Sequence, residues 1–223
     1  MNFLRGWFGE MKVRFYIWLW LPKTVYTRFH NIILPSSNGT TQIDHLIVSV
    51  YGLFIVETKN KKGWIFGSAR QRVWTQVIFG KKYSFQNPIN QTYRQRKVLS
   101  EYLEVNETKI YTVVFFVGDC RFKTDLPVNV IRSGISRYIK RFDREVFTTN
   151  EVSQIVNTLE AQIAKKEFSL RDHRRSLRRR HSSKTICPRC GSDLTIRIVK
   201  KGRRAGRQFY GCTSFPKCRY SRS

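Results

Sequence analysis

The segment TQIDHLIVSVYGLFIVETKN, Thr41–Asn60, decides the fold because it holds two apolar runs on either side of a Tyr-Gly pair. Such runs around a turn predict an antiparallel β-hairpin. Charged residues stand at its open end, with Asp44 near the start of the first run and Glu57 and Lys59 at the end of the second. Charges at one end of a hairpin that is apolar enough to be buried indicate a functional site.

The register of this hairpin determines which side chains lie together. A turn centred on the Tyr-Gly pair places Asp44 opposite Lys59 and Leu46 opposite Glu57. Opposite residues share a face of the sheet, and side chains along a strand alternate with a period of two. We therefore expect Asp44, Glu57 and Lys59 to converge on one face. The apolar residues nearer the turn share that face: Val48, Val50, Leu53 and Ile55.

This set of side chains suits metal-assisted hydrolysis of a phosphodiester bond. Asp44 and Glu57 can share a Mg²⁺ or Mn²⁺ ion, because Mg²⁺ prefers one or two carboxylates together with water and phosphate oxygens. Lys59 can position or activate a water molecule and offset negative charge on the phosphate. The structural alternative is a buried Glu57–Lys59 ion pair with Asp44 exposed.

The charge of the whole chain favours a polyanionic partner. Its 223 residues include 42 Lys and Arg against 15 Asp and Glu, for a net charge of +27. Such an excess opposes folding by self-repulsion and favours binding to nucleic acid first and to an anionic membrane surface second. A ribosome-like or merely soluble basic protein is the alternative. Hydrophobic residues make up 41% of the chain, which excludes a wholly disordered protein.

The order of predicted elements indicates an α/β fold with strands covered by helices. The continuous apolar run Ile110–Val117 predicts a central strand covered on both faces. Asn150 is a suitable N-cap for the last predicted helix, and we expect Trp64 and Trp74 in the core. Helices are predicted over residues 4–21, 88–103, 135–142 and 150–164, and further strands over 29–34, 64–66, 73–79, 83–85 and 128–131.

The composition divides the chain into three parts. Residues 1–164 form the α/β domain, residues 165–186 are a basic linker or helix extension, and residues 187–220 form a separate small unit. The apolar run Val13–Leu21 is far shorter than the roughly 20 residues that span a bilayer, so we expect no transmembrane segment. Its helix is amphipathic or buried. Interfacial membrane contact is the alternative, through Trp7, Trp18 and Trp20.

Four of the five cysteines lie in the last 37 residues, which indicates a metal site rather than scattered disulfides. Cys187 and Cys190 are separated by two residues, a 21-residue gap follows, and Cys212 and Cys218 are separated by five. Two pairs at this separation suit a tetrahedral zinc ion with a β-hairpin between them, over residues 194–199 and 208–210. Unrelated thiols or two disulfides are the alternative. Cys120 is expected in the core.

Several motifs resemble the nuclease-related domain family, often called NERD. They are Gly9-Glu10, the Thr41–Asn60 segment, Gly63, Trp74, Asn87-Pro88 and Gln91, within roughly residues 8–120 and more weakly to about residue 165. The family is placed in the PD-(D/E)xK fold, which implies a restriction-endonuclease-like mixed sheet flanked by helices. The resemblance implies that Asp44, Glu57 and Lys59 are catalytic, and it adds Glu10 as an acid that faces the metal. The proline of the PD signature is replaced by Ile43.

Three further residues are candidates for substrate contact. Gln42 lies on the same face as Asp44 and can support the site or touch a phosphate, with a strand-edge hydrogen bond as the alternative. Asn87 and Gln91 match the family pattern and can contact substrate or cap a helix. Capping is favoured for Asn87, because Asn before Pro begins helices well. His45 points to the opposite face and is expected to be structural.

The cysteine unit resembles the C-terminal zinc ribbon of bacterial type IA DNA topoisomerases. The likeness rests on the CPxCG start and the GC…FPKC end, over about Thr185–Tyr220. In those enzymes the ribbon binds DNA, mostly single-stranded. No other segment resembles a topoisomerase catalytic domain, so the ribbon implies DNA binding without strand passage. We expect DNA contacts from its basic loop and from one aromatic side chain that can stack on bases: Arg203, Arg204, Arg207 and Tyr210.

These observations favour a metal-dependent DNA endonuclease, with zinc as a structural cofactor and Mg²⁺ or Mn²⁺ as the catalytic one. The alternative is a non-catalytic protein that binds single- or double-stranded DNA and acts in DNA processing. The intact Asp44, Glu57 and Lys59 set favours the enzyme, because function lies in the site and not in the fold. We expect a cytoplasmic, nucleoid-associated protein, and cutting both strands would favour a homodimer.

Overall fold

The computed structural model describes residues 2–222, with side chains for residues 9–180 and 182–222. Its main sheet has five strands in the order β1-β2-β3-β7-β9. β1, β2 and β3 pair antiparallel, whereas β7 runs parallel to β3 and β9 runs parallel to β7. The strands are β1 Thr27–Ser36, β2 Gly39–Ser49, β3 Gly52–Lys59, β7 Ile110–Phe116 and β9 Val130–Ile131.

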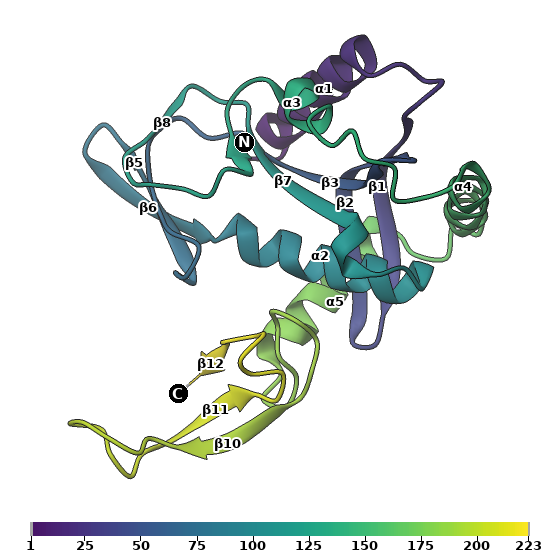
Figure 1. Ribbon diagram of the computed structural model, residues 1–223. Helices are drawn as coiled ribbons and strands as arrows, with labels where there is room; N and C mark the ends of the chain where they lie inside the picture. The colour runs from purple at the N-terminus through teal and green to yellow at the C-terminus, as the bar shows by residue number, and fades with distance from the viewer. Residues whose placement is uncertain (1, 223) are drawn as a thin grey trace.

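Helices cover both faces of this mixed sheet (Figure 1). On one face, α2 and α4 enclose a core that includes Leu46, Ile55 and Leu99. On the other, α1 and α3 enclose a core that includes Ile17 and Phe54. The helices are α1 Asn2–Trp20, α2 Pro88–Leu103, α3 Ile135–Ile139 and α4 Thr149–Ala164, with a 3-10 turn η1 at Glu107–Lys109. The predicted class, a mixed sheet flanked by helices, is confirmed.

A second sheet of four strands, in the order β6-β5-β4-β8, continues from the end of β3. β8 was not predicted from the sequence; it pairs parallel with β4 and begins at the buried Cys120. Gly118 permits the tight approach, because a Cβ there would lie 1.9 Å from the Lys61 carbonyl oxygen. The strands are β4 Gly63–Phe66, β5 Val73–Ile78, β6 Lys81–Gln86 and β8 Cys120–Phe122.

The two tryptophans of this sheet have different environments. Trp74 is fully buried, as predicted. Trp64 is 49% exposed, so the prediction that it lies in the core is wrong. Its neighbour Ile65 is buried, and alternation along β4 turns Trp64 to the outside, where Lys123 lies over its ring.

The hairpin register differs from the predicted one by two residues. Leu46 pairs with Ile55, not with Glu57. The prediction placed Gly52 in the turn, whereas Gly52 opens β3 with a φ of +136°, in contact with the following parallel strand. Continuing this register brings Asp44 opposite Glu57. A shift of two residues preserves which side chains share a face, so the predicted convergence of the charged residues is retained.

The start of α4 also differs from the prediction. Thr148, not Asn150, is the N-cap. The Thr148 side chain accepts from the backbone N–H of Glu151, and the Glu151 side chain accepts from the N–H of Thr148. This reciprocal capping box satisfies two N–H groups at once, which a lone Asn150 cap could not do.

The described part of the chain contains no helix that is long and apolar enough to cross a membrane. α1 buries Val13 and Ile17 against the sheet and exposes more than half of Trp18 and Trp20. The side chain of Trp7 lies outside the described side chains. The apolar run of α1 therefore serves first to cover one face of the sheet.

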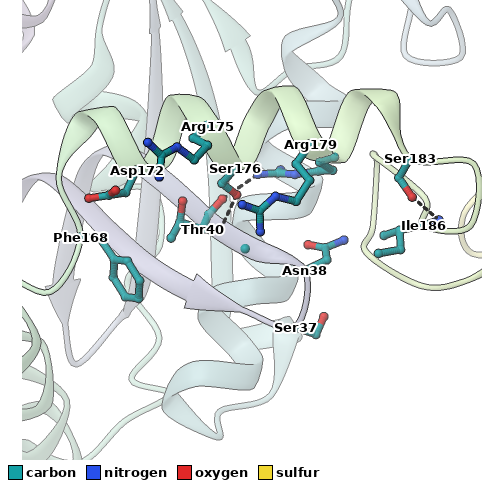
Figure 2. Close-up of a pocket in the computed structure, with 12 residues that line it drawn as sticks. Ser37, Asn38, Thr40, Phe168, Asp172, Arg175, Ser176, Arg179, Ser183 and Ile186 are labelled. Carbon is teal, nitrogen blue, oxygen red and sulfur yellow. Dashed lines mark hydrogen bonds between the residues drawn. The ribbon is translucent and has the colours of Figure 1, made fainter.

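The basic segment after α4 contains a helix, α5 Leu170–Ser182, that packs against the β1–β2 hairpin. The backbone N–H of Thr40 donates to Ser176 Oγ at 2.9 Å (Figure 2). Arg180 Nη2 donates to the Thr40 carbonyl at 2.6 Å. Gly39 permits this contact, because a Cβ there would lie 2.0 Å from Ser176 Oγ. α5 is therefore seated on the sheet that carries Asp44.

The cysteine unit lies beside α2 at the end of α5 (Figure 1). The Tyr93 ring packs against the four cysteines, and Lys97 Nζ donates to Ser192 Oγ at 3.4 Å. Asn38 Nδ2, from the β1–β2 turn, donates to the Gly191 carbonyl at 3.4 Å. The unit is thus docked on α2 and on the hairpin. Its strands are β10 Leu194–Ile198, β11 Gln208–Cys212 and β12 Ser221–Arg222.

Candidate active site and zinc centre

Two carboxylates meet where β2 and β3 leave the core. Asp44 Oδ2 accepts a hydrogen bond from the backbone N–H of Thr58 at 3.0 Å, which fixes the carboxylate across the two strands. Glu57 precedes Thr58 on β3 and is 1% exposed. The apolar residues of the same face fill the core beneath them. The two acids therefore form the polar end of a buried face.

Lys59 and the Gln95 amide of α2 hold Glu57, and the Gln91 amide of α2 holds Lys59. Lys59 Nζ forms an ion pair with Glu57 Oε1 and donates to Gln91 Oε1 at 3.1 Å. Gln95 Nε2 donates to Glu57 Oε2 at 2.8 Å and to the Gln42 carbonyl at 2.9 Å. Gln91 and Gln95 are four residues apart, so both project from one face of the helix. The structure thus brings the predicted Glu57, Lys59 and Gln91 into direct contact.

Glu10 approaches this group from α1. Gly9 permits the approach, because a Cβ there would lie 3.0 Å from the Asn60 Cβ at the end of β3. Burial raises the pKa of Glu10, a hydrogen bond with Asn31 lowers it, and the charge of Glu57 raises it. Glu10 is therefore within electrostatic reach of the site although α1 covers the other face of the sheet.

The charges of the site are strongly coupled. Burial raises the pKa of Asp44 well above its ordinary value of 3.8, and the charge of Glu57 adds to this effect. Burial by itself would lower the pKa of Lys59, but the carboxylates of Glu57 and Asp44 outweigh it, so the Lys59 pKa is raised. Lys59 consequently stays protonated at neutral pH. Two carboxylates thus share one fixed positive charge.

We predict that Asp44→Asn stabilises the protein when zinc is the only metal present. The folded-state pKa of Asp44 is raised, so the unfolded chain releases this proton first as the pH rises above 3.8. The free energy of unfolding of the wild type therefore falls with rising pH relative to the variant. Thermal melts should show Asp44→Asn higher by about 2–4 °C at about pH 7.5, with the difference vanishing near pH 4. A difference that is independent of pH would contradict this assignment.

The oxygen ligands of the site fit a divalent cation. Asp44 and Glu57 supply carboxylates of the kind that Mg²⁺ and Mn²⁺ prefer. A cation between them would offset the repulsion that helps to raise the Asp44 pKa. Among the described residues, the oxygens of Glu10, Asp44 and Glu57 do not all lie within 4.8 Å of one another. The candidate ligand set is therefore the pair Asp44 and Glu57, with Glu10 at its edge.

The other predicted substrate residues occupy different positions. Gln42 lines a cavity next to Asp44. Asn87 is fully buried and caps α2, with Oδ1 accepting from the backbone N–H of Ile89 at 2.9 Å. The structure thus gives Asn87 the capping role that its place before a proline favours. The Gln42 side chain donates to Asn31 Oδ1 at 3.3 Å, a hydrogen bond between β2 and β1 of the kind that was its alternative role.

His45 lies on the opposite face from Asp44, as its place in the strand requires. Its Nδ1 lies 2.8 Å from Nδ1 of His30. Burial lowers the pKa of His45 to about 3 and that of His30 to about 4. Both rings are therefore neutral at physiological pH, and the pair is a structural contact between β1 and β2.

Sequence reasoning missed several side chains that reach the site. Gln95 binds Glu57 directly, and its spacing of four residues from Gln91 is the signal that could have identified it. Arg94, His173 and Arg180 line the cavity next to Asp44. Nothing in the sequence pattern connects residues of α5 with β2, because more than a hundred residues separate them. Only the fold places the basic tail helix at the site.

The four clustered cysteines have the geometry of a zinc centre. Their Sγ atoms all lie within 4.8 Å of one another, and all four residues are buried. Sγ of Cys187 lies 3.8 Å from Sγ of Cys218, and Sγ of Cys190 lies 3.3 Å from Sγ of Cys212. A disulfide would be about 2.05 Å long. Sulfurs about 2.3 Å from a tetrahedral zinc ion lie about 3.8 Å apart. The cluster therefore fits a structural zinc ion.

The predicted DNA contacts of the ribbon lie on its outer surface. Tyr210 is half-buried in β11, and the guanidinium of Arg197 lies 5.4 Å from the centre of the exposed Phe215 ring. Basic groups next to aromatic rings suit a single-stranded nucleic acid, whose phosphates and bases they contact together. The loop between β10 and β11 exposes Arg203, Arg204 and Arg207.

Comparisons with known families agree with both parts of this description. Residues 5–117, just over half of the chain, match the family model described as "Nuclease-related domain". The chain belongs to the nuclease-related domain family. Residues 184–223 match the model described as "Topoisomerase DNA binding C4 zinc finger". Both resemblances that the sequence motifs suggested are therefore confirmed.

The comparison with curated proteins finds one relative of this chain. A protein of Bacillus anthracis, described as an uncharacterized protein, is 36% identical over 157 residues, which cover 66% of this chain and 72% of that protein. No solved structure matches the chain. The family indicates a nuclease-related function, and the zinc finger indicates DNA binding. α5 lies outside both matched regions, so its contacts with the site are a feature of the chain that neither family describes.

Proposed function

We propose that the protein is a metal-dependent DNA endonuclease that hydrolyses phosphodiester bonds. The observation that carries this proposal is the convergence of Asp44, Glu57 and Lys59 at the ends of β2 and β3, held by Gln91 and Gln95. Membership of a nuclease-related family and the basic zinc ribbon support the same substrate.

The residues of the site have distinct roles in this reaction. A water molecule adds to phosphorus, one P–O bond breaks, and the departing sugar oxygen takes a proton. Asp44 and Glu57 would hold a Mg²⁺ or Mn²⁺ ion, which would supply an activated water and positive charge at the phosphate. Lys59 keeps its proton, so it stabilises negative charge on the phosphate oxygens rather than acting as a base. Gln91 fixes the position of the Lys59 ammonium.

The direct test is cleavage by the purified full-length protein. Supercoiled plasmid and single-stranded DNA are incubated with Mg²⁺, with Mn²⁺ or with Ca²⁺, which resembles Mg²⁺ in charge but is larger and binds in a less rigid geometry. We expect cleavage with Mg²⁺ or Mn²⁺ and little or none with Ca²⁺. Absence of cleavage of both DNAs in every metal, with DNA binding intact, would contradict the proposal.

The second candidate is a non-catalytic DNA-binding protein on a nuclease-like scaffold. The observation that favours it is that both oxygens of Glu57 already have partners, Lys59 and Gln95. We prefer the enzyme because a carboxylate oxygen has two lone pairs, so these contacts leave room for a cation. The burial of two acids beside one lysine also carries a desolvation cost, which a bound cation would offset.

We assign the two activities to different parts of the chain. Residues 1–164 would cut, and the zinc ribbon, residues 187–220, would hold DNA together with the basic segment 165–186. Residues 165–223 carry 19 Lys and Arg against three acids. One site per chain cuts one strand, so we propose that two copies act together when both strands are cut. Because we propose DNA binding, we also propose a cytoplasmic, nucleoid-associated location.

We predict that replacing the three loop arginines of the ribbon by alanine weakens DNA binding and flattens its salt dependence. Each phosphate contact contributes about −0.7 to −0.9 to the slope of log affinity against log salt, so the slope should fall by roughly two units. Fluorescence anisotropy with Ca²⁺ over a salt series measures this. An unchanged slope would show that the loop does not contact phosphates. The three loop arginines replaced in this variant are Arg203, Arg204 and Arg207.

A further inference from the structure

A cavity beside the candidate active site has walls from distant parts of the chain. It has a volume of about 300 Å³ and adjoins Asp44 and Gln91. Helix α2 contributes Arg94 to its wall, and the tail helix α5 contributes His173 and Arg180. The cavity therefore exists only where the basic tail is seated on the nuclease-related domain.

Two buried arginines of this wall have unused hydrogen-bond donors. Arg180 is 6% exposed; its Nη2 donates to the Thr40 carbonyl, whereas its Nε has no partner among the described residues. Arg94 is 5% exposed; its Nε and Nη2 donate to Thr41, Ser36 and Asn38. Its Nη1 has no partner in the described part of the chain and lies beside Gly191 of the cysteine unit. A buried donor without an acceptor costs free energy. The free N–H of Arg180 is therefore suited to an acceptor that comes from outside the chain.

The charges around the cavity favour an anion. Burial, and after it the charge of Arg94, lowers the pKa of Arg180 to about 10, and burial lowers that of His173 to about 4. Arg94 has the thiols of Cys190 and Cys187 nearby. Within the described residues, neither arginine forms an ion pair with a carboxylate. Arg180 is thus a buried cation without a counter-ion of its own.

We propose that this cavity binds a backbone phosphate of the nucleic acid, with the guanidinium of Arg180 as the donor and the positive charge of Arg94 close by. The inference rests on the proposed function, because it seats this phosphate next to the one that is cut beside Asp44. Guanidinium groups bind phosphate oxygens through paired N–H donors at fixed geometry. The tail helix then does more than attract DNA, since it sets the position of the strand relative to the carboxylates.

The first test measures anion binding without cleavage. Full-length protein is melted in inorganic phosphate and in sodium chloride of equal ionic strength, without Mg²⁺ or Mn²⁺. At about ten times its dissociation constant, phosphate should raise the wild-type melting temperature by about 3–6 °C. Arg180→Gln should lose most of this increase. Equal increases in Arg180→Gln and in a charge-matched control would overturn the proposal.

The control must remove the same charge from the same helix. Arg178→Gln does so, because Arg178 is exposed and lines neither this cavity nor the neighbouring one. Arg175 and Arg179 are unsuitable, since they line that neighbouring cavity, of about 490 Å³, between α5 and the hairpin (Figure 2). Arg180 lines both cavities, so the variant at Leu177, which lines only the cavity beside Asp44, distinguishes them. Arg178→Gln should keep the full phosphate effect.

Arg180→Gln also removes the hydrogen bond from Arg180 to the Thr40 carbonyl, and this loss could detach α5 from the hairpin. A second variant therefore keeps Arg180 and blocks the cavity instead. Leu177 also lines the cavity, and Leu177→Phe adds volume there without removing a charge or a hydrogen bond. We expect Leu177→Phe to fold with a normal far-UV circular dichroism spectrum and to lose the phosphate effect. A full phosphate effect in this variant would count against the site.

A binding measurement with DNA distinguishes a site for a backbone phosphate from a site for free phosphate. The affinity for a short single-stranded oligonucleotide is measured with Ca²⁺ in place of Mg²⁺. Loss of a charge-assisted hydrogen bond should make Arg180→Gln bind roughly tenfold more weakly than Arg178→Gln. Equal affinities would overturn the backbone assignment. Because both measurements omit cleavage, a wild type that binds as expected but cuts nothing would refute the proposed function and leave this site standing.

Discussion

Asp44→Asn is expected to reduce metal-dependent DNA cleavage by at least about 10²–10³-fold, the usual cost of removing one group that stabilises the transition state. The substitution removes one of the two carboxylates that would hold the cation but keeps the size of the side chain. Its amide oxygen can still accept from the backbone N–H of Thr58, so the hairpin end should remain in place. Cleavage is measured under single-turnover conditions with Mg²⁺ and Mn²⁺.

The matched control is Asp125→Asn, because Asp125 is exposed in a loop and lies outside the site. It should cut at the wild-type rate. DNA affinity measured with Ca²⁺ should be the same for both variants and the wild type, since the ribbon holds the DNA. Wild-type cleavage by a folded Asp44→Asn variant would place the catalytic centre elsewhere.

Removal of zinc is expected to abolish most DNA binding. The core of the ribbon consists of the four cysteines with a few partly buried neighbours, so the metal supplies most of the folding free energy. In the unfolded ribbon, the basic side chains that contact phosphates would no longer lie together on one surface. Loss of about five contacts lowers the slope of log affinity against log salt by roughly four units, and the affinity at physiological salt by about 10²–10³-fold.

Cys212→Ser tests this expectation against Cys120→Ser. Metal analysis should find one zinc ion per chain in the wild type and in Cys120→Ser, because Cys120 lies in a different core cluster. Cys212→Ser should contain little or no zinc and bind DNA weakly. One zinc ion per chain in Cys212→Ser, or wild-type DNA affinity without zinc, would show that the cysteines do not form the DNA-binding unit.

The sequence predicts the local elements of this fold well where one physical signal dominates. Helix α2 begins at Pro88 and ends at Leu103, as predicted, because the Asn-Pro start and the apolar period agree. β8 was missed because its three residues, Cys120–Phe122, are too few for a periodic pattern. The hairpin register was wrong by two residues because the position of Gly52 depends on contact with β7, which lies far along the chain.

In the candidate site, too, some features follow from local sequence patterns and others only from long-range packing. The face shared by Asp44, Glu57 and Lys59 follows from strand alternation alone, so an error of two residues in register did not disturb it. The contributions of Arg94 and Arg180 depend on how the tail helix packs on the hairpin. Such packing is a long-range property of the folded chain, and no local pattern encodes it.

The contact between Arg180 and Thr40 joins residues 140 positions apart, so it bears on how the protein is made. Domains fold progressively from the N-terminus during synthesis. The strands that carry Asp44 and Glu57 can form early, but the cavity beside them lacks a wall until α5 has left the ribosome. A product that ended before residue 170 would keep the acids and lose that wall. Completion of the site would then coincide with synthesis of the segment that holds DNA.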